Sequence, residues 1–313
     1  MSGAVGPAGR DELAARIDHT VLDPSATDEQ IANAAGVAVS AGCASLCVAP
    51  VWVRFAVEAV GGRIPVASVV GFPHGTSLSS TKAHEAASVV ALGASEVDVV
   101  ADLSAVGAGD LLAVAADVAQ VRAAVPDAIV KVILETALWT PAVVRAAAEA
   151  ALEGGADMVK TSTGFHPAGG ASVEAVRALR SAVGVRAGVK ASGGIRDLAT
   201  ALAMVEAGAD RLGCSATEQL LAEGTFHTMK INRSMVDGVI EAPNGAHFTT
   251  CEPDYGRDEA FQKAYVEAAR DAESWKAFSD RFLAGSETDY QNAVTTWRAE
   301  AAAAPKTNKE AKS

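Results

Sequence analysis

The sequence has few cysteines and no extended basic block, and each shortage argues against a class of protein. Its four cysteines include one close pair, Cys43 and Cys47, with no second pair nearby, so free thiols are expected rather than a zinc site. Basic residues gather only in the tail 306–312, and the net charge of −12 argues against nucleic acid and anionic membranes as partners. We therefore expect a protein of the reducing cytoplasm.

Long apolar segments are also absent. Residues 30–53 carry no charge, but Gly36, Gly42 and Pro50 interrupt them, which predicts a helix, a glycine turn and a strand rather than a membrane span. The N-terminal stretch MSGAVGPAGRDEL lacks the apolar core of a signal peptide. Neither segment predicts attachment to a membrane.

Aromatic residues are scarce in the first part of the chain. Five of the fifteen lie in residues 1–225 and ten lie in 226–313. Ala and Val make up much of the apolar content instead, which suits helices packed closely on buried parallel strands. The change in composition near residue 225 predicts that the tail is a separate unit.

Eight apolar runs of strand length recur along residues 17–215, with helix-forming, Ala-rich segments between them. The runs are 17–22, 45–49, 65–72, 96–102, 129–136, 157–162, 188–194 and 211–215. Their spacing is roughly that of one βα unit. A glycine followed by a small residue precedes several runs, as a left-handed helix cap would require. The pattern predicts an α/β fold, the (β/α)8 TIM barrel.

A doubly wound sheet is the alternative, and the chain lacks its signature. No glycine-rich dinucleotide turn follows the first run, and no Walker-type GK[ST] occurs. The barrel is therefore the favoured fold.

Ionisable residues lie in or near runs that otherwise consist of Val, Ile and Ala. They are Asp18, Asp98, Asp102, Lys131, Glu135, Lys160 and Lys190. Burying such groups costs desolvation energy, and Asp98 with one lysine could form a buried pair that only fixes packing. Two lysines on neighbouring strands fit that explanation poorly, because each makes protonation of the other harder. One lysine could then be neutral near pH 7.

A neutral lysine amine can attack a carbonyl carbon and form a protonated Schiff base. The iminium draws electrons from the adjacent carbon–carbon bond, and a carboxylate such as Asp98 could move the protons through a water molecule. This chemistry needs neither a metal nor a cofactor, and none is predicted. Two turns could hold a phosphate: Gly193 and Gly194 before a helix expected to begin at Ile195, and Ser215 after the last run.

Seven motifs in this order resemble the deoxyribose-phosphate aldolase family: IDHTVL, LCVAP, GFPHG, EVDVV, KVILET, VKTSTGF and VKASGGIR. The resemblance covers about residues 11 to 222. It implies a class I aldolase that reversibly cleaves 2-deoxy-D-ribose 5-phosphate to acetaldehyde and D-glyceraldehyde 3-phosphate. It also implies a homodimer that takes a sugar phosphate as substrate.

The resemblance assigns roles to residues of this chain. Lys160 corresponds to the Schiff-base lysine, Lys190 to the lysine that lowers its pKa, and Asp98 to the proton relay. Gly193, Gly194 and Ser215 correspond to phosphate contacts. Thr161, at the end of its run, could bind substrate or only the backbone.

Two positions depart from the family pattern. Asp23 stands where many members have a lysine, and the last turn reads Gly-Cys-Ser-Ala, with Cys214 and one hydroxyl fewer than usual. Two alternatives therefore stay open: an aldolase for another phosphorylated sugar, and a catalytically silent barrel that serves as a binding module.

Other polar residues have a plain interpretation. Cys47 is expected to be a small buried apolar residue, and His19 to order the first strand by hydrogen bonds. Lys131 and Glu135 could be structural support, although Lys131 could also reach the lysines and Asp98.

The segment 233–265 resembles the C-terminal end of the A subunit of heteromeric CoA transferases of the glutaconate type, through GAHFTT and the later Y-x-x-D. The large body of that subunit is missing, so CoA-transferase activity is not expected. The predicted domains are a flexible N-terminus over 1–10, the aldolase barrel over 11–225, this extension over 226–300 and a disordered tail over 301–313.

Overall fold

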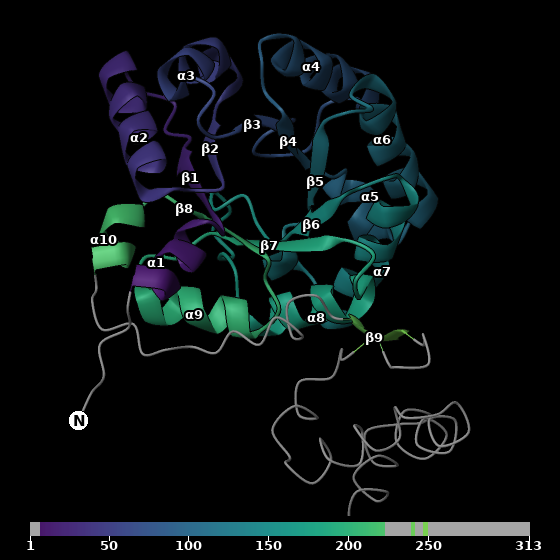
Figure 1. The fold of residues 1–313 in the computed structure, drawn as a ribbon. Coiled ribbons are helices and arrows are strands. Elements are labelled where there is room, and N and C mark those ends of the chain that lie inside the picture. The colour runs from purple at the N-terminus through teal and green to yellow at the C-terminus, as the bar shows by residue number, and fades with distance from the viewer. Residues whose placement is uncertain (1–6, 223–238, 242–246, 250–313) are drawn as a thin grey trace, which may run out of the picture. The chain divides into compact units, whose positions relative to one another are not determined.

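A computed structural model describes residues 7–222, 239–241 and 247–249 (Figure 1). Eight parallel strands pair in chain order and close on themselves as a barrel, because β8 also pairs with β1. The strands are β1 (Ile17–Val21), β2 (Ser45–Val48), β3 (Val66–Val70), β4 (Glu96–Val100), β5 (Ile129–Ile133), β6 (Met158–Lys160), β7 (Gly188–Ser192) and β8 (Arg211–Cys214). The predicted (β/α)8 barrel is confirmed.

Helices follow every strand and surround the barrel (Figure 1). The α-helices are α1 (Pro7–Ala14), α2 (Asp28–Ala41), α3 (Val53–Val60), α4 (Ser79–Ala91), α5 (Leu103–Ala108), α6 (Leu111–Ala124), α7 (Pro141–Glu153), α8 (Val173–Val183), α9 (Leu198–Glu206) and α10 (Thr217–Ala222). Short 3-10 helices, η1 (Pro50–Trp52) and η2 (Thr136–Leu138), begin two of the connections. Among the described residues, no helix is long and apolar enough to cross a membrane.

The segment predicted as a helix, a glycine turn and a strand folds in that way. Thr27 and Gln30 form a capping box that starts α2, since each side chain bonds the other residue's backbone amide. Gly42 ends the helix with a φ of 72°, a left-handed conformation that costs glycine little. β2 follows directly, so the uncharged stretch is accounted for by two elements of the barrel.

Strand residues alternate between two environments, because successive side chains point to opposite faces. In β4, Val97 and Val99 join the apolar layer between the barrel and its helices. Glu96 and Asp98 point the other way, into the barrel, where they contact lysines of other strands. The apolar core therefore lies outside the barrel, and much of the barrel interior is polar.

Two arginines hold the amino-terminal edge of the barrel in the same way. Arg122 of α6 binds Asp157 and the Gly155 carbonyl, and the Asp157 carboxylate also accepts the amide of Val130 in β5 at 2.7 Å. The second arginine, Arg180 of α8, repeats this pattern two βα units further along the chain. It binds the carbonyl and carboxylate of a second Gly-Ala-Asp segment, 208–210, whose carboxylate accepts a β7 amide at 2.8 Å. Each of these two arginine clamps ties one helix to two strands.

Several boundaries differ from the sequence predictions, and all eight strands end one to three residues before the predicted runs do. α1 begins at Pro7, inside the segment 1–10 predicted to be flexible, and it is anchored by the buried Leu13 and Ala14. β6 ends at Lys160 instead of residue 162. α9 begins at Leu198 instead of Ile195, because the Asp197 carboxylate accepts the Thr200 amide and fixes the helix start there.

The chain divides into two compact units, 1–236 and 237–313. In the second unit the structure describes β9 (Val239–Glu241) and β10 (His247–Thr249), which pair antiparallel. The rest of the predicted extension over 226–300 and the whole predicted tail over 301–313 lie outside the described residues. The predicted domain boundaries stay predictions.

Candidate active site

The three residues predicted to carry the chemistry meet inside the barrel. Lys160 is the last residue of β6 and lies in register with Lys190 of β7. Asp98 reaches them from β4, and its Oδ2 atom is 2.8 Å from the Lys160 Nζ atom and 2.7 Å from the Lys190 Nζ atom. All three are buried, with at most 3% of a side chain exposed. One carboxylate therefore bridges both lysines.

A second layer of charge lies below them, toward the amino-terminal end of the strands. Lys131 of β5 contacts Asp98 at 3.0 Å, Asp18 at 3.1 Å and Glu96 at 2.5 Å. Asp18 also contacts Lys190 at 2.5 Å and Arg211 at 2.6 Å. We call the full set the barrel cluster: Asp18, Glu96, Asp98, Lys131, Lys160, Lys190 and Arg211.

The lysines of the cluster differ in their carboxylate partners. Within 4 Å, in the part of the chain that the structure describes, Lys160 has one carboxylate, Lys190 has two and Lys131 has three. Burial disfavours the ammonium form of each, and a carboxylate favours it. Lys160 is consequently the lysine for which burial is least compensated.

The pKa directions follow this difference. Burial lowers the pKa of Lys160, the positive charge of Lys190 lowers it further, and the opposing effect of Asp98 is too small to restore the usual value of 10.5. For Lys190 and Lys131, burial also acts downward, but Asp18 and Asp98 outweigh it and raise both pKa values. Among the three lysines of the cluster, only Lys160 has its pKa shifted toward the neutral amine.

Asp98 is held as a carboxylate. Burial by itself would raise its pKa, but the charges of Lys131, Lys160 and Lys190 outweigh that effect and lower the pKa well below 3.8. An ionised Asp98 can accept hydrogen bonds from the amines on both sides. It therefore offers a fixed negative charge beside the Lys160 amine.

Two members of the cluster were missed from the sequence. Glu96 lies two residues before Asp98, and Arg211 lies two before Gly213, so the two-residue period of a strand turns both side chains into the barrel. Each occupies the first position of its strand and resembles an exposed strand end in the sequence. The alternation was the signal that could have found them.

Asp102 and Glu135, collected with the catalytic candidates, lie elsewhere. The Asp102 carboxylate caps α5 by accepting the amides of Ser104 and Ala105. Glu135 is 1% exposed, has a φ of 48°, and its carboxylate accepts both the amide and the hydroxyl of Thr163, the latter at 2.6 Å. Glu135 therefore fixes the turn that follows Lys160.

Thr161 makes its hydrogen bonds to the backbone. Its hydroxyl donates to the Ser192 carbonyl at 3.2 Å and accepts the Ser192 amide at 3.0 Å, and the residue is fully buried. These bonds join β6 to β7 just beyond the two lysines. The geometry favours the backbone alternative for Thr161, and a substrate contact stays a prediction.

The turn at Gly193 and Gly194 is set by close backbone contacts. Both glycines have positive φ angles, 89° and 82°. A Cβ atom on Gly193 would lie 2.9 Å from the Gly170 Cα atom, so only glycine fits between the two loops. The first turn of α9 is partly occupied by its Asp197 cap. Phosphate binding at this turn stays a prediction.

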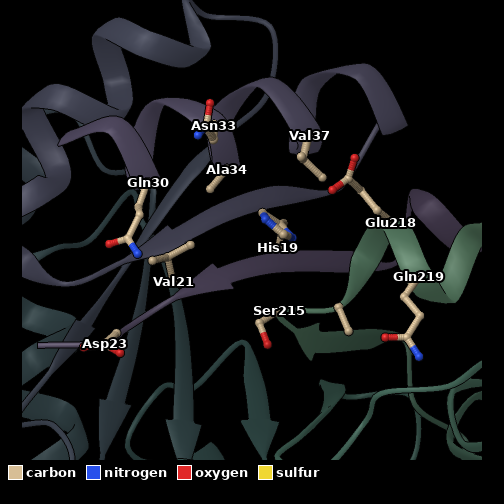
Figure 2. Close-up of a pocket in the computed structure, with 11 residues that line it drawn as sticks. His19, Val21, Asp23, Gln30, Asn33, Ala34, Val37, Ser215, Glu218 and Gln219 are labelled. Atoms are coloured by element: carbon tan, nitrogen blue, oxygen red, sulfur yellow. The ribbon is translucent and has the colours of Figure 1, made fainter. Parts of the chain in front are cut away.

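Ser215 is exposed and lines a cavity of about 450 Å³ between β1, α2 and the start of α10 (Figure 2). His19 points into the same region from the outer face of β1, opposite to the inward Asp18, and its Nδ1 atom is 2.8 Å from the Thr217 hydroxyl. Burial lowers the His19 pKa to about 4, so the ring is neutral near pH 7. The bond to Thr217 agrees with the prediction that His19 orders the first strand by hydrogen bonds.

Cys47 lies inside the barrel and is fully buried. Burial and the charge of Asp98 raise the pKa of its thiol to about 11, against the opposing effect of nearby lysines. A thiol that stays protonated is a poor nucleophile. This agrees with the prediction that Cys47 is a small buried apolar residue.

Among the described residues, no group of three or more His, Cys, Asp or Glu side chains could hold a metal ion.

Comparison with known proteins agrees with this geometry. The sequence profile described as "DeoC/LacD family aldolase" matches residues 13–224. The deoxyribose-phosphate aldolase of Mycobacterium avium is 52% identical over 216 residues, which cover 68% of this chain and 96% of that protein. The enzyme of the same name from Kocuria rhizophila is 53% identical over 213 residues, with the same two shares of coverage.

Solved structures give the same result. The tetrameric deoxyribose phosphate aldolase of Aeropyrum pernix is 38% identical, with a TM-score of 0.63 over 68% of this chain and 91% of that one. The aldolase QR15 is 37% identical, with a TM-score of 0.65 over 67% of this chain and 95% of that one. The chain therefore belongs to the DeoC/LacD family of aldolases.

Proposed function

We propose that the protein is a class I aldolase that reversibly cleaves 2-deoxy-D-ribose 5-phosphate to acetaldehyde and D-glyceraldehyde 3-phosphate. The observation that carries the proposal is the buried Lys160 amine, whose pKa is lowered while those of Lys131 and Lys190 are raised. A lowered pKa increases the share of the neutral amine, which is the nucleophilic form of a lysine. Relatives that bear this enzyme's name are about half identical to the chain over nearly their whole length.

Lys160 acts first, on the aldehyde of the open-chain sugar. The Nζ lone pair attacks C1, the carbonyl oxygen takes up protons and leaves as water, and a protonated imine joins Nζ to C1. Asp98, 2.8 Å from Nζ, holds the amine in place before the attack. After the imine has formed, the same carboxylate lies close to its positive nitrogen.

Cleavage breaks the bond between C2 and C3. The C3 hydroxyl gives up its proton, through a water molecule, to Asp98, and its electron pair forms the aldehyde of glyceraldehyde 3-phosphate. The electrons of the broken bond move to the imine nitrogen and give a neutral enamine. A proton then returns to C2, and water releases acetaldehyde from Lys160.

The barrel cluster sets the charge around the imine. With Lys160 neutral, the cationic Lys131, Lys190 and Arg211 balance the carboxylates of Asp18, Glu96 and Asp98. The iminium adds one positive charge beside the Asp98 carboxylate. Cleavage removes that charge from the nitrogen while the proton of the C3 hydroxyl neutralises Asp98, so the net charge of the cluster does not change in this step.

The phosphate end of the substrate is proposed to bind at the carboxyl-terminal edge of the barrel, at Gly193, Gly194 and Ser215. The positive φ angles of the two glycines, and the exposure of Ser215 just after β8, support this placement. Thr161 supports the site indirectly by fixing the β7 backbone at Ser192, just before those glycines.

Borohydride trapping with 2-deoxy-D-ribose 5-phosphate, followed by peptide mass mapping, tests the function. The expected result is a reduced adduct on Lys160 that is absent in Lys160→Leu. Trapping with a different phosphorylated sugar and poor cleavage of deoxyribose 5-phosphate would favour the alternative substrate. Neither an adduct nor cleavage with any sugar phosphate would favour a catalytically silent barrel.

The assembly and location are further proposals. A homodimer is proposed from the family resemblance, and light scattering must distinguish two subunits from four, since the Aeropyrum pernix relative is described as tetrameric. A cytoplasmic location is supported by the free thiols of Cys43, Cys47 and Cys214. Fractionation of the source cells would test it.

A further inference from the structure

We propose that Arg211 and Glu96, at the amino-terminal end of the barrel, set the protonation state of Lys160 at the other end by fixing the charge balance of the barrel cluster. The proposal rests on the assignment of Lys160 as the nucleophile. Neither residue contacts Lys160 in the structure, so both would be positioning residues that act through the carboxylates between them.

The contacts form a continuous chain of charges. Arg211 lies 2.6 Å from the Oδ1 atom of Asp18 and 3.6 Å from Glu96. The Oδ2 atom of Asp18 contacts Lys190 at 2.5 Å, and Lys190 contacts the same Asp98 oxygen that binds Lys160. Each carboxylate therefore contacts one residue nearer the amino-terminal end of the barrel and one residue nearer Lys160.

The numbers of acids and bases in the cluster show why Arg211 and Glu96, at the amino-terminal end of the barrel, affect Lys160. Lys131, Lys160, Lys190 and Arg211 are four bases, and Asp18, Glu96 and Asp98 are three acids. A buried cluster is most stable when its charges cancel, because an uncompensated charge cannot be solvated. One base is therefore favoured as neutral. Arginine keeps its proton in proteins, so the neutral base must be a lysine.

Lys160 is the lysine that carries the least compensation. The charged or ionisable groups around it are Asp98 from β4, Lys190 from β7 and Cys47 from β2, with Lys131 and Asp18 one contact further away. Lys190 and Lys131 each contact Asp18 as well as Asp98. Arg211 thus supplies the surplus positive charge, and Glu96 limits it.

Removing either charge should move the Lys160 pKa, in opposite directions. Arg211→Gln leaves three lysines for three carboxylates, so Lys160 is expected to be protonated and its pKa to rise by about one pH unit, the size expected for a unit charge on the order of 10 Å away. Glu96→Gln removes a negative charge, so the pKa is expected to fall by a similar amount. The double variant should return it to the parent value.

Competitive labelling with a small amine-reactive compound across a range of pH measures the pKa of Lys160 directly. Peptide mass mapping of the full chain gives the extent of labelling at Lys160. Arg211→Lys keeps the charge and is the matched control, so its midpoint should stay within a few tenths of a pH unit of the parent. Circular dichroism checks that every variant is folded. If Arg211 and Glu96 had a purely structural role, their substitution would lower stability or activity without moving the two labelling midpoints in opposite directions.

The results separate this inference from the proposed function. Opposite shifts in the two single variants, cancelled in the double variant, would support the inference whether or not an imine forms. Equal midpoints in folded variants would overturn it, even if borohydride still traps substrate on Lys160. If Arg211→Gln does not fold, the comparison of Glu96→Gln with the double variant still decides, since the inference requires the double variant to have the higher midpoint.

Discussion

Two buried lysine sites of the protein use the same residue type for different purposes. Lys82 of α4 contacts Asp117 of α6 at 2.7 Å, and its side chain is fully buried between the helices outside the barrel. Asp117 also accepts the Asp102 amide at 3.1 Å, which ties the pair to the turn after β4. Inside the barrel, by contrast, Lys160 shares its one carboxylate, Asp98, with two other lysines.

The difference teaches which buried lysines can be reactive. One lysine facing one carboxylate is balanced, and breaking such a buried pair leaves a charge without compensation. A lysine in a cluster with more bases than acids can lose its proton at little cost. The ratio of acids to bases, more than burial itself, therefore distinguishes Lys160 from Lys82. Four predictions test or extend this comparison.

The largest effect is expected for Lys160→Leu. Because Lys160 is the proposed nucleophile, kcat/KM should fall on the order of 10³-fold or more. Because its amine is favoured as neutral, its loss leaves the other six charges balanced, and the free energy of unfolding should change by less than about 1.5 kcal/mol. Steady-state kinetics and urea unfolding measure the two quantities. A loss of several kcal/mol would mean that Lys160 is a structural cation.

For Lys82→Met we expect a large loss of stability and little change in activity. The substitution leaves Asp117 buried without its cation, and the free energy of unfolding should fall by about 3–5 kcal/mol. The kcat of the molecules that stay folded should be unchanged within about twofold, because Lys82 lies outside the barrel. The double variant Lys82→Met/Asp117→Asn removes both charges, keeps an acceptor for the Asp102 amide, and should recover most of the stability.

A smaller effect is expected for Glu135→Gln. Its carboxylate accepts the amide of Thr163, three residues after Lys160, on both oxygens and the Thr163 hydroxyl on one of them, whereas a glutamine side chain has a single oxygen to accept these bonds. Loss of one such buried bond should lower kcat/KM by about tenfold. Thr163→Ser keeps the hydroxyl and is the control. If Thr163→Val were as active as the parent, the bond would not position the site.

The smallest effect is a shift in pH dependence. The rate of imine trapping should rise with pH as Lys160 loses its proton, because only the neutral amine attacks a carbonyl. Its midpoint should lie below 10.5, since burial and Lys190 lower the Lys160 pKa. Trapping of an aldehyde that carries no phosphate measures the midpoint without interference from phosphate titration. A midpoint at or above 10.5 would contradict the comparison with Lys82.

Much of the fold could be predicted because the barrel repeats one local pattern. The Ala- and Val-rich strands are buried on both faces, and glycines such as Gly93 and Gly208 end helices with positive φ angles of 107° and 109°. The start of α9 was predicted three residues early, because the sequence alone does not reveal that Asp197 caps it. Asp98, by contrast, was visible from the sequence as a charged residue inside an apolar run.

The site could be predicted only as far as its motifs reach. Lys160, Lys190 and Asp98 stand out because charge is rare inside such strands. Arg211 and Glu96 do not stand out, because a charged residue at the first position of a strand is usually exposed. Their role depends on contacts with Asp18 and Lys131, which come from strands far apart in the sequence and meet only when the barrel closes.

The two arginine clamps have a consequence for engineering this protein. They hold the amino-terminal edge through Gly-Ala-Asp segments at 155–157 and 208–210, away from the edge where the strands deliver Lys160 and the glycine turn. Substitutions at 165–169, in the loop after Thr163, would change what the pocket admits without touching either clamp. Libraries for new acceptor aldehydes should therefore vary that segment and leave both Gly-Ala-Asp segments intact.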